Sequence, residues 1–135
     1  MRRLLIPALL LGLAGCGSED TYENALRPPS PINVTAAVDE DRVRVSPRSF
    51  GAGPVVFVIA NQSGAAQRLT FETDDLGGGA GITRSTREIP DGSTGTLQVD
   101  APEGTYLLSA GTGVRAAAIE VGEPRPSSQD ELLLP

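Results

Sequence analysis

Short runs in which apolar and polar residues alternate recur along the middle of the chain. Alternation is typical of a strand with one buried face, because successive side chains of a strand point to opposite faces of the sheet. The run at 55–60 is instead continuously apolar, which predicts a strand buried on both faces. The predicted strands, about seven in number, are 32–38, 42–45, 55–60, 67–73, 95–100, 105–110 and 115–121.

Residues that favour turns separate these runs. They occupy 51–54 (Gly-Ala-Gly-Pro), 61–64 (Asn-Gln-Ser-Gly), 90–92 (Pro-Asp-Gly) and 102–104 (Pro-Glu-Gly). Glycine and asparagine tolerate a positive φ, and proline presets the corner of a turn. A helical period of 3.6 residues does not persist after the N-terminal segment. Short strands at this spacing predict an all-β fold, specifically an antiparallel Greek-key β-sandwich.

The alternation also predicts which side chains form the core. Leu69 and Phe71 share one face of their strand, and Leu97 and Val99 share one face of another. These four side chains are expected to point inward. Phe57, in the middle of the most apolar run, is expected to lie in the same core.

The first 16 residues have a different pattern. Met1-Arg2-Arg3 is a cationic start, Leu4–Leu13 is an apolar run, and small residues follow it. This order is typical of a secretory signal peptide. The run is too short to cross a membrane, which takes about 20 apolar residues. Residues 1–15 are therefore predicted to be a signal peptide.

The sequence Leu13-Ala14-Gly15-Cys16 resembles the lipobox of bacterial lipoproteins. The resemblance implies that Leu13, Ala14 and Gly15 form the cleavage motif and that the sulfur of Cys16 receives a diacylglycerol. The new N-terminus would then be acylated, for example with palmitate, and would anchor the chain on the extracytoplasmic face of a cell membrane. Cys16 is the one cysteine of the sequence and cannot form an internal disulfide. The alternative interpretation is an incidental thiol after an ordinary signal peptide.

Composition divides the remaining chain into three parts. Residues 16–31 are polar and end in prolines, which indicates a lipidated N-terminus followed by a flexible tether. Residues 32–122 are long enough for one small domain. Residues 123–135 are again polar and proline-rich and end in Leu132-Leu133-Leu134-Pro135, which favours a disordered tail.

The charge of the chain argues against two classes of partner. Cleavage before Cys16 would leave nine of the 11 basic residues against 17 acidic ones, a formal charge of about −8. Binding to nucleic acid depends largely on neutralising phosphates, so an acidic domain is a poor candidate for it. The same charge disfavours a domain lying flat on anionic lipid. The membrane is thus expected to be contacted through the lipid on Cys16.

Three stretches together resemble the cupredoxin family. They are PVVFVIANQSGAAQRLTFE at 54–72, IPDGSTGTLQV at 89–99 and PEGTYLLSA at 102–110. The resemblance covers about residues 32–121 and implies a Greek-key sandwich. Tyr106, two residues after Gly104, also fits a tyrosine corner, in which the hydroxyl binds a nearby backbone group.

The family resemblance further implies a copper site with two His, one Cys and usually a Met. Carried onto this sequence, the first histidine position is Gln67 and the cysteine position is Ala110. The loop at 111–115 would hold the other ligands and contains neither His nor Met. The resemblance therefore implies the fold without the copper ligands, and no cofactor or metal is expected.

Other chemistry has weak support in the sequence. The chain has no His and no Lys, so a serine nucleophile would lack its usual nitrogen base. The acidic runs at 39–41 and 74–75 could act as paired carboxylates or bind Ca²⁺, but their spacing favours solvated loops. The glycine-rich run at 77–81 lacks the Gly-Lys-Ser/Thr of a phosphate loop and indicates a flexible loop. We expect no catalytic residues and hence no enzyme.

The expected function is a membrane-anchored, non-catalytic binding or scaffold module with an envelope protein as partner. One alternative is an accessory or assembly factor for a copper or respiratory membrane complex. A more distant alternative is an acidic-site hydrolase.

Overall fold

All regular secondary structure in residues 26–74 and 81–128, which the computed structural model describes, is β-strand. This part of the chain has no helix, so none in it is long and apolar enough to span a bilayer. The prediction of an all-β fold is confirmed. The strands are β1 (Ile32–Val38), β2 (Val43–Ser46), β3 (Ser49–Asn61), β4 (Thr70–Thr73), β5 (Thr83–Ser85), β6 (Thr94–Ala101), β7 (Gly104–Ser109) and β8 (Ala117–Pro124).

The eight strands form one open, mixed sheet. Their hydrogen-bonded order is β2-β1-β3-β8-β7-β4-β5, and β6 pairs with β3 off this path. The expectation of purely antiparallel pairing is wrong, because β3 is parallel to both β1 and β8. The β1–β2 hairpin brings the chain back to the end where β1 begins, so β3 runs in the direction of β1 when it pairs on that strand's other side. Strand alternation does not encode this choice of neighbour.

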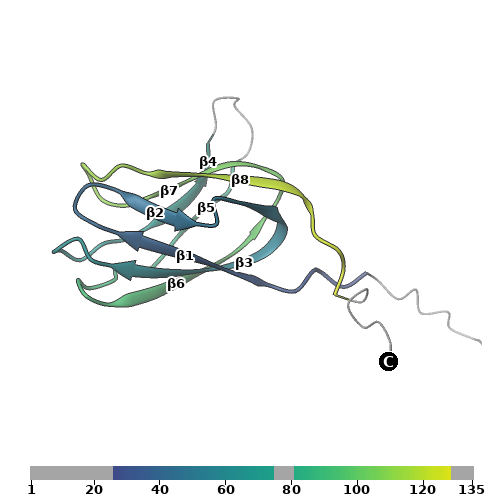
Figure 1. Ribbon diagram of the computed structural model, residues 1–135, viewed down its shortest axis with the longest axis horizontal. Coiled ribbons are helices and arrows are strands. Elements are labelled where there is room, and N and C mark those ends of the chain that lie inside the picture. The colour runs from purple at the N-terminus through teal and green to yellow at the C-terminus, as the bar shows by residue number, and fades with distance from the viewer. Residues whose placement is uncertain (1–25, 75–80, 129–135) are drawn as a thin grey trace, which may run out of the picture.

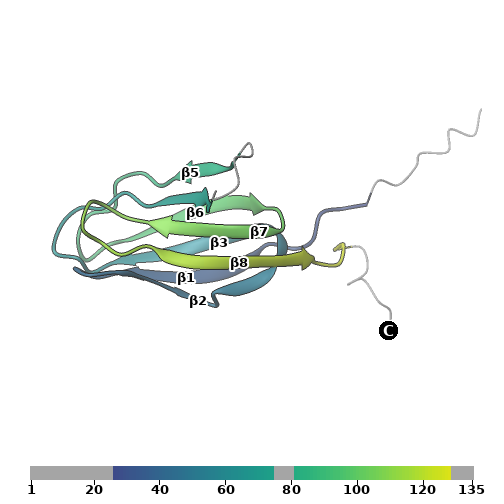
Figure 2. The same ribbon diagram turned by 90° about the horizontal axis from the view of Figure 1, so that it is seen from above.

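Strand β3 connects the two parts of the sheet. It is 13 residues long, and its first part, Ser49–Ala52, pairs with β8. After an irregularity between Gly51 and Ala52, the part from Gly53 to Ala60 pairs with β6. Figure 1 shows the result, with β7 and β8 running above β1, β3 and β6, and Figure 2 shows the same strands from above.

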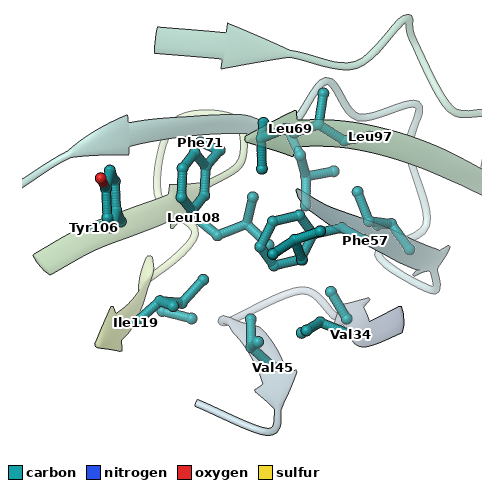
Figure 3. Packing of buried hydrophobic residues seen from close by; sticks show 14 of the residues in the cluster. Val34, Val45, Phe57, Leu69, Phe71, Leu97, Tyr106, Leu108 and Ile119 are labelled. Carbon is teal, nitrogen blue, oxygen red and sulfur yellow. The ribbon is translucent and has the colours of Figure 1, made fainter. Parts of the chain in front are cut away.

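The core lies between these strands and is built around aromatic rings. The ring centroids of Phe57 and Phe71 are 5.4 Å apart, and Phe71 stacks on Tyr106 at 4.6 Å. Aliphatic side chains from both parts of the sheet surround the rings (Figure 3). The predicted burial of Phe57, Leu69, Phe71, Leu97 and Val99 is confirmed.

The run at 55–60 is buried on one face only, so the prediction of burial on both faces is wrong. Val55, Phe57 and Ile59 are buried, whereas the alternating residues between them remain partly exposed. Strands β1 and β6 flank β3 on either side and shield its outer face without covering it. Apolar side chains on a partly shielded outer face therefore gave the sequence the appearance of a fully buried strand.

Tyr106 makes the predicted tyrosine corner. Its hydroxyl donates a hydrogen bond of 2.8 Å to the carbonyl oxygen of Pro102. The ring is buried, and this burial raises the pKa of the Tyr106 hydroxyl. The structural interpretation of this residue is confirmed.

The hydrogen-bonded structure extends past both predicted domain boundaries, 32 and 122. Strand β8 continues to Pro124, and the next residue, Arg125, binds three carbonyl oxygens. Its guanidinium donates to Gly51, Ser30 and Pro54, and we call this group of contacts the Arg125 clamp. The segments on either side of the domain also contact each other, since Ser127 Oγ donates to the carbonyl of Arg27 at 2.7 Å.

Two glycines of β3 make room for the Arg125 clamp. An added Cβ would lie 2.7 Å from Arg125 Cγ at Gly51 and 2.6 Å from Pro29 Cγ at Gly53. Gly53 also has a φ of +131°, which L side chains rarely adopt. The Gly-Ala-Gly-Pro run, predicted from the sequence to be a turn, lies within β3, which changes direction there and receives the two flanking segments (Figure 1).

Replacing Phe57 by alanine should lower the free energy of unfolding by about 3–5 kcal/mol, because it leaves a cavity among the rings. Urea unfolding followed by circular dichroism measures the change. Val58→Ala, one residue further along β3 and partly exposed, is the control and should cost clearly less. Equal losses in the two variants would contradict the assigned core.

Replacing Arg125 by alanine should lower the free energy of unfolding by about 1–3 kcal/mol, because three carbonyl oxygens lose a charged donor. The side chain of Arg48 is exposed, so Arg48→Ala is the matched control. Hydrogen exchange should show faster exchange at the amides of Arg27, Ser30 and Ile32, the ones this proline-rich segment has, in the Arg125 variant only. Unchanged exchange there would show that the clamp does not hold the N-terminal segment.

Candidate functional site

Four connections meet at one end of the molecule, which we call the loop end. They are 39–42, 62–69, 86–93 and 110–116. The register places them together, since Val38 lies beside Asn61 and Ala60 lies opposite Thr94. Both described chain ends leave from the opposite end, as Figure 1 shows. The loop end is therefore the part of the domain furthest from the points where the chain enters and leaves it.

Asn61 holds two connections of the loop end together, 62–69 and 86–93. Its side chain is fully buried, and Nδ2 donates to the carbonyl oxygens of Ala65 at 2.7 Å and Ile89 at 2.8 Å. Oδ1 accepts hydrogen bonds from the backbone nitrogen and the hydroxyl of Ser63. A buried amide is costly unless its polar atoms are paired, and here both are. The sequence predicts only that Asn61 lies in a turn, and its buried hydrogen bonds are a finding of the structure.

Further hydrogen bonds join the loops at 61–65 and 89–93. Gly64 N donates to Asp91 Oδ1 at 2.9 Å, and Gly92 N donates to the carbonyl of Asn61 at 2.8 Å. The backbones of Gln67 and Ile89 exchange two hydrogen bonds beside them. The sequence contains residues typical of turns at both places, Asn61 at the end of an apolar run and Pro-Asp-Gly at 90–92. Neither turn indicates which other loop it contacts.

Gln67 lies next to the loop that follows Ala110. Its Oε1 accepts a hydrogen bond of 3.0 Å from Gly111 N, and Ala110 packs against the core. The fold thus brings together the two positions at which the cupredoxin resemblance places copper ligands. The donor set does not fit copper, because a methyl group and an amide oxygen already bound to backbone replace a thiolate and an imidazole.

The acidic run at 39–41 stabilises the turn in which it lies, through hydrogen bonds to the carboxylate of Asp39. Asp39 Oδ1 accepts hydrogen bonds from the backbone nitrogens of Arg42 and Asp41, and Oδ2 lies 3.0 Å from the guanidinium of Arg44. The bond from Arg42 above all, and then that from Asp41, lowers the pKa of the Asp39 carboxyl. Asp74 is the described residue of the second acidic run; Asp75 and residues 77–80 of the glycine-rich run lie outside the described residues.

The titratable groups of residues 26–74 and 81–128 are not assembled into a reactive centre. These residues contain no group of three or more His, Cys, Asp or Glu side chains placed to hold a metal ion. Within the same ranges, the one buried ionisable side chain is Tyr106, whose hydroxyl donates a hydrogen bond to the carbonyl oxygen of Pro102.

Two surface hollows, each of about 510 Å³, are lined by residues at or next to the loop end. One lies between residues 85–90 and β6. The other is lined by residues 41–42 and 113–115, where Arg42 and Arg115 form an isolated parallel bridge. These hollows, and not a cluster of acids or bases, are the candidate binding features of the domain.

The anchor residues predicted from the sequence, Leu13, Ala14, Gly15 and Cys16, lie outside the described residues. A scan against protein-family models finds no match to the chain. A search of curated proteins finds none either.

The full chain mixed with Cu(II) should show neither intense blue absorption nor tight one-to-one binding, because it offers no imidazole and its one thiol is expected to carry lipid. Isothermal titration and visible spectroscopy measure both properties. The thermal midpoint should also stay unchanged, since only specific binding to the native state raises it. Saturable binding at micromolar copper or below would contradict the prediction.

Proposed function

We propose that this chain is an extracytoplasmic lipoprotein, anchored in a cell membrane through Cys16, whose domain is a non-catalytic binding or scaffold module. In this proposal the domain is a copper-free β-sandwich of cupredoxin type. The observation that carries the proposal is the position of the Arg125 clamp. It fixes the entering chain at the end of the domain opposite the loop end.

The sandwich assignment is supported by three features of the fold. Strands β7 and β8 lie across the core from β1, β3 and β6, and a Greek-key path would connect such layers. Tyr106 makes the tyrosine corner that such folds use. Gln67 and the loop after Ala110 meet at the end where a cupredoxin would hold its metal.

The anchor and the clamp together define how the domain would be presented. About ten residues separate Cys16 from Arg27, whose carbonyl oxygen accepts a hydrogen bond from Ser127, and ten residues span at most about 35 Å. The domain would stay close to the membrane with its loop end directed away from the lipid. Loops held at a fixed distance from a surface suit the capture of a partner, and a domain of this charge would not itself bind anionic lipid.

The meeting of Gln67 with the loop at 110–111 also supports the second candidate function, an accessory part of a copper or respiratory membrane complex. Such a part would keep the cupredoxin shape as an assembly surface. Purification of the tagged full chain from gently solubilised native membranes distinguishes the two. Stoichiometric recovery of a copper-containing complex would favour the accessory role, and recovery of a copper-free partner would favour the general binding module.

Replacing Cys16 by serine should abolish acyl labelling and release the processed chain or leave it uncut, because two or more acyl chains are needed for stable anchoring. Metabolic labelling with palmitate and fractionation of membranes measure the change. Ser18→Ala, two residues further along, is the control and should remain anchored. A Cys16 variant that is labelled and membrane-bound like the control would contradict the lipoprotein assignment.

A further inference from the structure

Strand β6 has an unpaired edge. It pairs with β3 along its whole length, from Thr94 opposite Ala60 to Ala101 opposite Gly53. No other described strand pairs with it, and Figure 1 shows it at the rim of the lower strands. Every second residue of an edge strand directs its backbone N–H and C=O away from the sheet, where they are free to pair with another extended chain.

The other two free edges of the sheet are shorter than β6, and each carries a charge near its middle. Strand β2 has four residues and contains Arg44, and β5 has three residues and contains Arg84. Short length and charge are common means by which proteins protect an edge from pairing. Strand β6 has eight residues, and its one charged residue, Asp100, is next to last, so Thr94–Val99 has neither charge nor proline.

A groove of about 510 Å³ follows the edge of β6. Residues 85–90 form one wall and residues 94–98 the other. Ile89 occupies the space left by Gly95, where an added Cβ would lie 2.5 Å from Ile89 Cδ1. The wall carries one positive and one negative side chain, Arg87 and Glu88, so the groove has no net charge, and Ile89 beneath it is buried in the core.

We propose that β6 and this groove bind an extended segment of a partner protein, which adds to the sheet as a further strand. Backbone hydrogen bonds to β6 would supply affinity, and alternate side chains of the segment would enter the groove. The balanced charge favours uncharged side chains at those positions, and the extended conformation of the segment favours β-branched ones.

The groove favours a partner segment over a second copy of this chain. If two copies paired through β6 about a twofold axis, Leu97 and Val99 of each copy would stay in their own cores. The groove would then receive no side chain. An inserted segment fills it with every second residue.

This inference deepens the proposed binding role and rests on it for its biological setting. The binding itself belongs to the folded domain and does not depend on whether Cys16 carries lipid. Loss of membrane anchoring in the Cys16 variant would therefore leave the following test unaffected, and failure of this test would leave the anchor in place.

The probe is a fluorescent, end-capped peptide of seven alternating valines and threonines, titrated against the full chain in detergent and followed by anisotropy. The matched peptide has the same side chains and N-methyl groups on alternate amides, which removes one hydrogen-bonding edge. The first peptide should bind saturably with a Kd of about 1 mM or below, and the methylated one at least about tenfold more weakly. Saturable binding of both peptides with equal affinity, or no binding of the first, would overturn the proposal.

A pair of variants locates the site. Thr96→Lys places a charge on β6 and should weaken binding of the first peptide at least about tenfold. Thr105→Lys places the same charge on β7, which is paired on both sides, and should not change it. Equal affinity in the two variants would overturn the assignment to β6. A dimer that sedimentation shows to be broken by Thr96→Lys alone would overturn it in favour of a second copy.

Discussion

The double pairing of β3 is the constraint on which the rest of the fold depends. Its first residues pair with β8, and its later residues pair with β1 and β6. One strand therefore fixes the position of both parts of the sheet, and Phe57, at its centre, reaches the rings of Phe50 and Phe71. Gly51 and Gly53, where the strand changes partners, leave the space in which Arg125 binds. Core and chain ends are thus set by the same 13 residues.

The local pattern of apolar and polar residues was sufficient to predict features that depend on a single strand, such as which of its faces is buried. Alternation identified the inward faces of Leu69, Phe71 and Leu97, and the Gly-x-Tyr sequence identified the corner made by Tyr106. Pairing between distant strands was not predictable in this way, because alternation is the same for parallel and antiparallel neighbours. Strand β5 was missed because its three residues are all exposed and carry no apolar signal.

The candidate site was less predictable than the fold, since it depends on contacts across large sequence separations. Asn61 and Ile89 are 28 residues apart, and Gln67 and Gly111 are 44 apart. The residue types of a turn indicate that the chain reverses, and they do not indicate which other turn it will contact. The groove beside β6 was likewise invisible, because Thr94–Gln98 is an ordinary alternating strand until its missing neighbour is known.

The Arg125 clamp has a mechanical consequence for a domain that is held by its N-terminal segment. A pull on that segment first loads the hydrogen bonds that join residues 27–31 to Arg125 and Ser127. The load then passes along β1, whose seven residues are paired with β3 on one side and partly with β2 on the other. Those bonds lie across the direction of the pull and must shear together, so the strand nearest the tether is also one of the hardest to draw out of the sheet.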